Sequence, residues 1–284
     1  MIRFGLHSSL WTARWTPAAL ESLAPEAARH GLEVIEIALL APETIDVEHS
    51  VRVLRDHGLA PTCSLGLPLE VTAPRHPDQA QAYLLRALEV AHALGSNTLS
   101  GVTYATIGYT SGLPPTEEEY ANIAKALRPV ARRAADLGMS LGIEPCNRYE
   151  THLVNTAAQA VRLIERIGEP SVMIHLDTYH MNIEEKGFRR GIRDAGSHLR
   201  YIHLSESDRG VPGTGTVDWE ATCAALAETG FEGDMVVESF VTLPPEIARA
   251  LSVWRPVARS AEQVLREGVP YLRELAGRHG LLEG

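Results

Sequence analysis

Four apolar segments in the second half of the chain lead into side chains that can bind a hard metal ion: Glu144, Asp177, His203 and Glu238. The intervals between them, about 26 to 35 residues, each match one strand followed by one helix. In a barrel of parallel strands the carboxyl ends of the strands open on one mouth, so this spacing predicts that the four side chains meet. Three carboxylates and one imidazole suit a divalent ion such as Mn²⁺, Mg²⁺ or Co²⁺.

Each of these acids taken alone has a simpler interpretation, as a helix cap or a loop anchor. Burying three carboxylates together, however, costs free energy unless a cation accompanies them. Four such side chains at the period of a barrel therefore favour a metal site. His175 lies inside an apolar segment and is predicted to be part of the core.

Short apolar segments alternate with amphipathic ones along the whole chain. Strands are predicted at 2–7, 32–37, 60–65, 97–102, 140–144, 172–177, 200–204 and 234–239. Helices are predicted from about 17, over 42–57, 77–95, 116–138 and 156–168, and at about 189–195, 219–229 and 256–276. Capping boxes mark two helix starts, at Thr116 with Glu119 and at Thr156 with Gln159.

Eight strand–helix units without a linker predict an α/β fold, a single (β/α)₈ barrel domain covering residues 1–284. The rival fold is a two-domain, doubly wound protein, which calls for a glycine-rich phosphate turn after the first strand. The segment that follows that strand has no such pattern. The barrel is therefore favoured.

The composition argues against several classes of partner. The chain has 26 Lys and Arg against 36 Asp and Glu, a net charge of −10, which disfavours nucleic acid. No apolar run reaches the roughly 18 to 20 residues that a membrane span needs, so no membrane partner is expected. Three cysteines without a paired spacing and a first segment that is typical of a strand predict a cytoplasmic protein.

Three segments extend the pattern around the candidate ligands: residues 142–150 (GIEPCNRYE), 175–185 (HLDTYHMNIEE) and 203–209 (HLSESDR). Together with 237–240 and Trp254-Arg255, they resemble the D-tagatose 3-epimerase/D-psicose (allulose) 3-epimerase family. The resemblance covers most of the chain and is densest between about 140 and 255. It implies a xylose-isomerase-like barrel that epimerises free ketoses at C3 with a divalent metal, Mn²⁺ before Co²⁺ or Mg²⁺.

The resemblance also implies roles for individual residues. Glu144, Asp177, His203 and Glu238 would be the metal ligands, and Glu144 and Glu238 would also act as the catalytic acid and base. Glu150, His180 and Arg209 match positions that bind the first carbons and hydroxyls of the sugar. A homodimer or homotetramer is expected on the same grounds.

The chemistry of C3 inversion explains the need for two carboxylates. A proton leaves C3 beside the C2 carbonyl, and another must arrive on the opposite face. One base cannot reach both faces unless the sugar turns over, so an acid and a base flank the carbon. The metal would act as a Lewis acid on the developing cis-enediolate.

The sequence leaves several alternatives open. A ketose-phosphate epimerase or an aldose–ketose isomerase would use the same scaffold, and Arg209 with the loop at 210–215 could hold a phosphate. A non-catalytic sugar-binding module would not need both Glu144 and Glu238. Trp11 and Trp15 would either wall the pocket or pack on the first helix. The apolar segment with Trp254, Val264 and Leu272 would serve either oligomerisation or the core.

Overall fold

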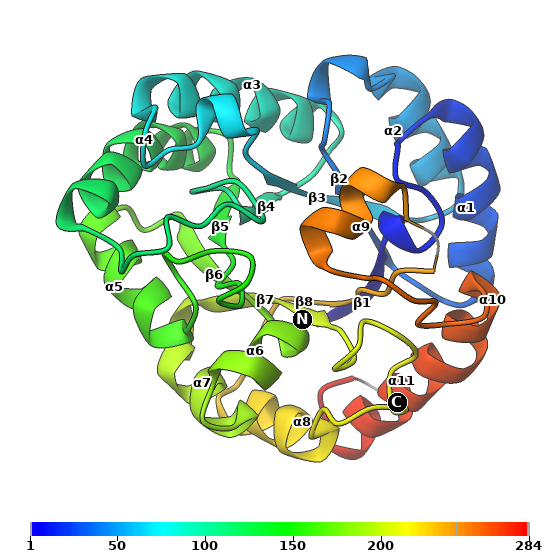
Figure 1. The fold of residues 1–284 in the computed structure, drawn as a ribbon. Coiled ribbons are helices and arrows are strands. Elements are labelled where there is room, and N and C mark those ends of the chain that lie inside the picture. The colour runs from blue at the N-terminus through cyan, green and yellow to red at the C-terminus, as the bar shows by residue number, and fades with distance from the viewer. Residues whose placement is uncertain (1, 242, 283–284) are drawn as a thin grey trace.

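Eight strands pair in parallel in chain order, and the first also pairs with the eighth, which closes the sheet into a barrel (Figure 1). The computed structural model describes residues 2–241 and 243–282, so Met1, Thr242, Glu283 and Gly284 of the predicted domain lie outside the described residues. A closed parallel barrel confirms the predicted (β/α)₈ fold, because a doubly wound protein would have an open sheet.

All eight predicted strands are present, with small differences at their ends. They are β1 (Arg3–His7), β2 (Val34–Ala38), β3 (Ala60–Gly66), β4 (Thr98–Val102), β5 (Ser140–Ile143), β6 (Val172–Asp177), β7 (Leu199–Leu204) and β8 (Asp234–Val237). Most strand residues are buried, as expected for a parallel sheet covered by helices on its outer face.

Helices surround the barrel as an outer ring (Figure 1). The ring comprises α1 (Pro17–Arg29), α2 (Val47–Asp56), α3 (Pro77–Ala93), α4 (Glu117–Asp136), α5 (Ala157–Ile167), α7 (Phe188–Ala195), α8 (Trp219–Glu228) and α11 (Val269–Arg278). Both predicted capping boxes are formed, at Thr116 and at Thr156. None of the described helices is long and apolar enough to cross a membrane.

Two of the predicted helix starts are wrong. Pro42 begins only a 3₁₀ turn (Pro42–Thr44), and α2 starts later because the side chain of Asp46 caps it by accepting the N–H of His49. The last helix starts not at Pro256 but at α10 (Ala261–Gln263), and it passes through a π-helical turn (Val264–Gly268) before α11. Pro270, which has no N–H to donate, lies in the first turn of α11, just after the π-helical turn.

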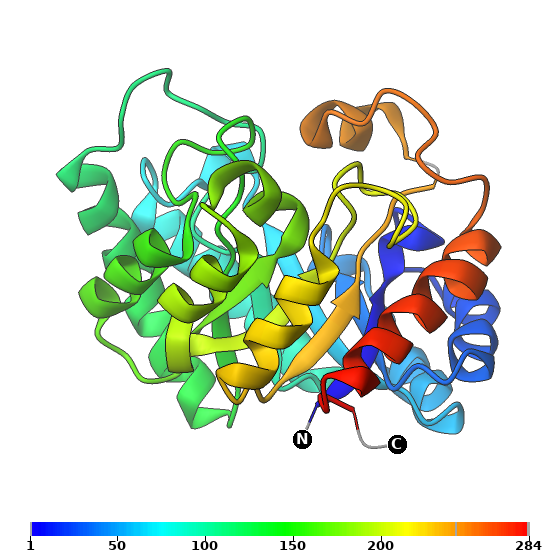
Figure 2. The ribbon, with the colours of Figure 1, turned by 90° about the horizontal axis from the view of Figure 1, so that it is seen from below.

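Two short helices were not predicted, and both lie near the mouth of the barrel. α6 (Thr178–Glu184) follows β6 directly, and α9 (Pro245–Leu251) follows β8. In the side view of Figure 2, α9 lies above the barrel, at the end opposite the two termini. The helix α9 is only seven residues long, so its apolar side chains are too few to give a clear helical period.

The barrel interior contains a polar layer beneath the mouth. His175 is fully buried, as predicted, and its Nδ1 lies 2.9 Å from the hydroxyl of Ser100. Tyr201 and Glu36 are buried beside it, and the hydroxyl of Tyr201 donates to Glu36 at 2.7 Å. Buried polar groups must be hydrogen-bonded, so this layer constrains the side chains above it.

The strands β3 and β4 approach closely at Gly101, where a larger side chain should destabilise the fold. Gly101 has a φ of 92°, and a Cβ added to it would lie 2.6 Å from the carbonyl oxygen of Leu65. Gly101→Ala should therefore lower the free energy of unfolding by about 3 kcal/mol, through strain and overlap together. Gly58→Ala is the control, because Gly58 also has a positive φ, 67°, but no atom within 4 Å of a Cβ. It should cost about 1 kcal/mol; equal losses in denaturant unfolding would contradict the prediction.

Candidate active site

The four predicted metal ligands meet at the mouth of the barrel. Glu144 follows β5, Asp177 ends β6, His203 lies near the end of β7 and Glu238 follows β8. All four are buried. Measured from Nδ1 of His203, the nearest carboxylate oxygens lie at 3.7 Å in Glu144, 3.9 Å in Asp177 and 3.7 Å in Glu238. The barrel thus gathers three acids around one ring nitrogen.

The two ring nitrogens of His203 have different surroundings. Nε2 lies 2.6 Å from Oε2 of Glu36, a carboxylate that can only accept. Neutral His203 therefore carries its proton on Nε2 and keeps a lone pair on Nδ1, which has no hydrogen-bond partner among the described residues. A free imidazole lone pair facing three carboxylates is a donor set for a divalent cation, so these residues fit such an ion.

The electrostatics of the site favour positive charge. Burial raises the pKa of Glu144 well above its usual range, and the like charges of Asp177 and Glu238 add to the effect. Burial opposes ionisation of Asp177 too, but Arg209 and the nearby imidazoles outweigh it and lower the pKa of Asp177. Burial works against a charge on His203, yet the neighbouring acids raise its pKa well above the usual range. Without a metal ion, protons bound to Glu144 and His203 would compensate part of the negative charge of the site.

His180 faces the same carboxylates, and Asn147 sets its orientation. The backbone N–H of Asn147 donates to Nδ1 of His180 at 3.1 Å, and Nη2 of Arg209, which can only donate, lies 3.2 Å from Nε2 of the same ring. Burial lowers the pKa of His180, which keeps the ring neutral. Nε2 lies 3.8 Å from an oxygen of Glu144. The side-chain amide of Asn147 donates to Glu150 at 2.9 Å, and Glu150 is buried as well. His180 is thus held between Asn147 and Arg209, beside the candidate ligands.

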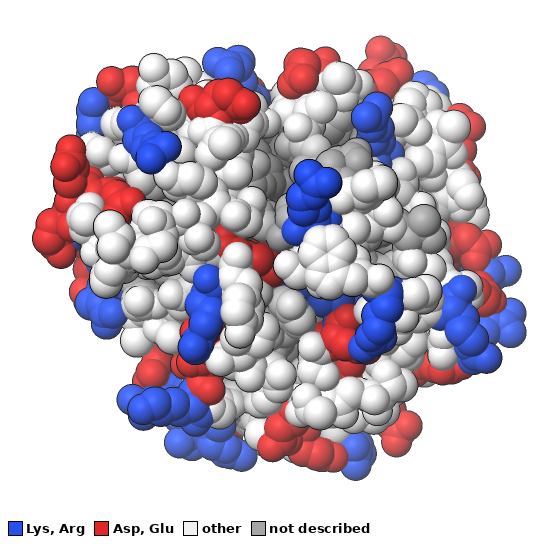
Figure 3. Space-filling view, viewed as in Figure 1, with Lys and Arg blue, Asp and Glu red and all other residues white. Residues whose placement is uncertain are grey.

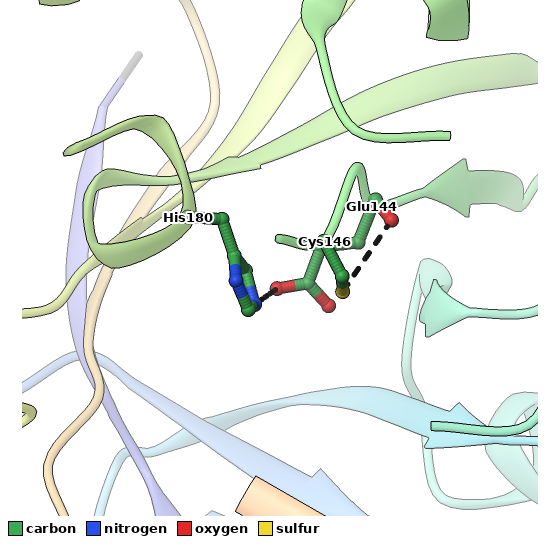
Figure 4. A group of neighbouring side chains, drawn as sticks. All are labelled: Glu144, Cys146 and His180. Atoms are coloured by element: carbon green, nitrogen blue, oxygen red, sulfur yellow. Dashed lines mark hydrogen bonds and ion pairs between the residues drawn. The ribbon is translucent and has the colours of Figure 1, made fainter. Parts of the chain in front are cut away.

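A second possible metal-binding group consists of Glu144, Cys146 and His180 (Figure 4). Burial raises the pKa of the Cys146 thiol well above its usual range, so the sulfur keeps its proton. Its Sγ lies 3.7 Å from the carbonyl oxygen of Glu144 and donates to it. Nε2 of His180 already faces a donor, Nη2 of Arg209, at 3.2 Å. This group therefore suits a metal ion less well than the set around His203.

Arg209 reaches the ligand cluster from the loop after β7. Its Nη1 lies 3.0 Å from an oxygen of Asp177 and forms a short ion pair with Glu238. Its guanidinium carbon stands 4.1 Å from the ring centre of Tyr179. The backbone of Arg209 has a φ of 63°, which is uncommon for a residue other than glycine, and its N–H donates to the carbonyl of Glu206 at 2.8 Å. The loop is built to present this cation to the acids.

A cavity of about 310 Å³ opens beside the cluster. Glu144, His203 and Glu238 are among the residues that line it, together with the polar side chains of His7, Ser9, Thr12, Ser64 and Thr106. Many of the other lining side chains are apolar: Leu40, Leu65, Leu67, Val102, Ile107, Leu243, Ile247 and Leu251. No Lys or Arg is among the described residues that line the cavity. Figure 3 looks onto this mouth and shows basic and acidic residues interspersed around a central hollow. The cavity has the size of a small ligand, and its lining combines acids, hydroxyls and apolar side chains.

The structure also resolves the alternatives for the aromatic and C-terminal residues. Trp15 is buried, and its Nε1 donates to the hydroxyl of Ser50 in α2 at 3.0 Å, so it packs against the helices. Val264 and Leu272 are buried in the core, whereas Trp254 is 72% exposed. The core interpretation therefore holds for two of the three C-terminal side chains.

The sequence reasoning missed three buried residues that organise the site. Glu36 contacts His203, Asn147 holds His180, and Glu206 anchors the loop of Arg209. Glu36 could have been recognised from the sequence, because it is a lone acid inside the apolar segment of β2. An unpaired charge is costly in such a place, so it calls for a partner. Asn147 and Glu206 lie in loops, where polar residues are ordinary.

Residues 24–275 match the family model described as xylose isomerase-like TIM barrel. The chain belongs to this family. An L-ribulose 3-epimerase of Methylomonas sp. (strain DH-1) is 34% identical over 279 residues, which cover 96% of this chain and 97% of that protein. A ketose 3-epimerase of Arthrobacter globiformis is 35% identical over 280 residues, 96% of each protein.

Solved structures agree with these relatives. The crystal structure of a D-allulose 3-epimerase from Methylomonas sp. in complex with D-allulose matches with a TM-score of 0.91 at 34% identity, and the match covers 96% of each chain. The resemblance to the ketose 3-epimerases, and with it the membership of a group of isomerase-class enzymes, is thereby confirmed.

Within this xylose isomerase-like barrel, Glu206 holds the loop that follows β7. It is fully buried, and its two oxygens accept the N–H groups of Ser207, Gly213 and Val217 and the indole N–H of Trp219. Burial alone would raise the pKa of Glu206, but these donors outweigh it and lower it below the usual value. The carboxylate therefore stabilises the folded loop while it is ionised.

We expect this carboxylate to make the protein acid-sensitive. A folded-state pKa below the unfolded value of 4.5 gives stability that is present above that pH and is lost as the pH falls through the folded pKa. Glu206→Gln should lower stability at pH 7 by about 2 kcal/mol, because an amide cannot accept all four bonds. It should also reduce the loss of melting temperature between pH 6 and pH 3. Exposed Glu43→Gln is the control and should behave as wild type; equal acid sensitivity of the Glu206 variant and wild type would refute the assignment.

Proposed function

We propose that the protein is a metal-dependent 3-epimerase of free ketoses. The observation that carries this proposal is the unpartnered Nδ1 of His203 facing three buried carboxylates, with His180 and the guanidinium of Arg209 beside them. The ketose 3-epimerase relatives at 34% and 35% identity support the same reaction. Suitable ketoses are D-fructose and D-allulose, D-tagatose and D-sorbose, or L-ribulose and L-xylulose.

In this proposal Glu144, Asp177, His203 and Glu238 hold the divalent ion, which supplies Lewis-acid stabilisation of negative charge on the sugar oxygens. The set has three oxygen donors and one nitrogen donor and no thiolate, which favours Mn²⁺, with Co²⁺ or Mg²⁺ as alternatives. Homodimer or homotetramer assembly and a cytoplasmic location stay predictions.

The protein groups divide the proton transfers between them. Glu144 and Glu238 flank the reacting carbon from β5 and β8, and we assign one to remove the C3 proton and the other to return a proton on the opposite face. Which of them acts as base would depend on the epimer that binds. The ring of His180 and the fixed positive charge of Arg209 lie beside the carboxylates, so we assign both to hold the oxygens at C1 and C2 while the cis-enediolate forms. Glu150 would position hydroxyls and hold Asn147.

The lining of the cavity favours a free sugar over a sugar phosphate. A phosphate carries about two negative charges and is normally met by Arg, Lys or a helix N-terminus. The described lining of the cavity instead presents side chains such as Leu67, Ile247 and Leu251 and has no Lys or Arg. Arg209, the cation proposed for phosphate from the sequence, is not among the described lining residues and pairs with Asp177 and Glu238. A terminal phosphate would therefore be buried without a counter-charge.

The acid–base role of Glu238 can be tested by substitution. Glu238→Gln keeps the shape but cannot take a proton from carbon, so turnover should fall by about 10³-fold. Deuterium entry at C3 in D₂O, followed by NMR over the ketose panel with Mn²⁺ present, measures the step directly. Glu228→Gln, on the exposed face of α8, is the matched control. If Glu238→Gln still exchanged deuterium at C3, the mechanism would be refuted. Deuterium at C1 together with aldose formation would indicate an isomerase instead.

Metal binding should depend on pH in a defined direction. Because burial raises the pKa of Glu144, the cation must displace a proton there, and affinity for Mn²⁺ should rise with pH, up to about tenfold per unit. Calorimetry in buffers of different ionisation enthalpy counts the released protons. Glu144→Gln should bind Mn²⁺ more weakly and with a flatter pH dependence. An affinity independent of pH in wild type would contradict the assignment of Glu144 as a ligand.

A further inference from the structure

Glu36 is a charged residue in the interior of the barrel, and the reaction as described gives it no task. It lies in the middle of β2, is 1% exposed, and is not among the described residues that line the cavity. Its Oε2 lies 2.6 Å from Nε2 of His203 and accepts the hydroxyl of Tyr201 at 2.7 Å. Two donors thus converge on one carboxylate oxygen.

Other residues fix Glu36 in turn. The hydroxyl oxygen of Tyr201 lies 2.8 Å from the hydroxyl of Thr62, and since Tyr201 donates to Glu36, Thr62 donates to Tyr201. On the other side, Oε1 of Glu36 faces Nε2 of His7 at 3.6 Å. His7 accepts the N–H of Ser9 at Nδ1, so its own proton also points from Nε2 towards Glu36.

We propose that Glu36 is a positioning residue of the metal site, which holds His203 in the tautomer that leaves Nδ1 free for the ion. This inference rests on the proposed function, since it concerns the same site. The three acids opposite Nδ1 would otherwise attract the ring proton to that nitrogen and block the lone pair. Glu36 provides a competing acceptor on the far side of the ring, and Thr62 and Tyr201 keep that acceptor in place.

The first test measures Mn²⁺ binding to metal-depleted protein, using the electron paramagnetic resonance signal of free Mn²⁺. Glu36→Gln keeps an acceptor but removes the charge, and it should weaken binding about tenfold. Glu36→Leu removes the acceptor altogether and should weaken binding by up to about 100-fold. Tyr201→Phe leaves His203 untouched, so its effect should be smaller than that of either Glu36 variant.

Asp234→Asn is the matched control. Asp234 is another buried acid of the barrel, but it starts β8 at the opposite end and pairs with Arg3 at 2.7 Å. It should lose thermal stability without a change in Mn²⁺ affinity. If the Glu36 variants and Asp234→Asn show the same affinity as wild type, Glu36 has only a structural role and the inference is wrong.

A second measurement needs no variant. Nitrogen-15 NMR of histidine-labelled, Mg²⁺-loaded wild type should show His203 protonated at Nε2 and not at Nδ1. A proton on Nδ1 would overturn the inference even if the Glu36 variants fail to fold. Wild type that binds neither ion would overturn the proposed function, and this inference with it, whereas normal binding by wild type and by Glu36→Leu would overturn this inference alone.

Discussion

Mutual repulsion of three buried carboxylates is the constraint on which the rest of the site depends. Glu144, Asp177 and Glu238 lie out of water, where like charges interact strongly and each charge loses its hydration. Two groups that can carry positive charge lie close to these acids: the guanidinium of Arg209 and the imidazole of His203. Burial, with the like charges added to it, still raises the pKa of Glu144 well above its usual range in spite of these two groups. A site whose negative charge is only partly compensated is suited to hold a divalent cation.

The barrel makes this arrangement with little help from loops. Asp177 and His203 are direct register partners on β6 and β7, and Glu144 and Glu238 follow the last residues of β5 and β8. Rigid strands therefore place the carboxylates, and the short helix α6 and the loop after β7 add His180 and Arg209. A site built on strands has a more exact geometry than one built on loops, which matters where protons must move over short distances.

The period of the strand ends made most of this site predictable from the sequence. Glu144, Asp177, His203 and Glu238 could be placed together because each ends a recognisable strand. The features that could not be predicted depend on contacts distant in sequence. Glu36 meets His203 across the barrel interior, a relation that no local pattern shows. The helix α9 was missed because it is short, and the true start of α2 depended on a cap at Asp46 that competed with the proline signal at Pro42.

The charged groups of the site and the apolar side chains that line the cavity contribute to one chemical effect. Proton transfer at carbon is slow unless the negative charge that develops on neighbouring oxygens is stabilised, and fixed charges do this best where water is excluded. In the proposed reaction the acids and Arg209 supply the charges. The apolar side chains of the lining, to which α9 contributes Ile247 and Leu251, keep the effective dielectric constant around those charges low. The described lining has no Lys or Arg but includes the hydroxyls of Ser9, Thr12, Ser64 and Thr106, so hydrogen bonds and not ion pairs would recognise the remaining carbons of a free ketose.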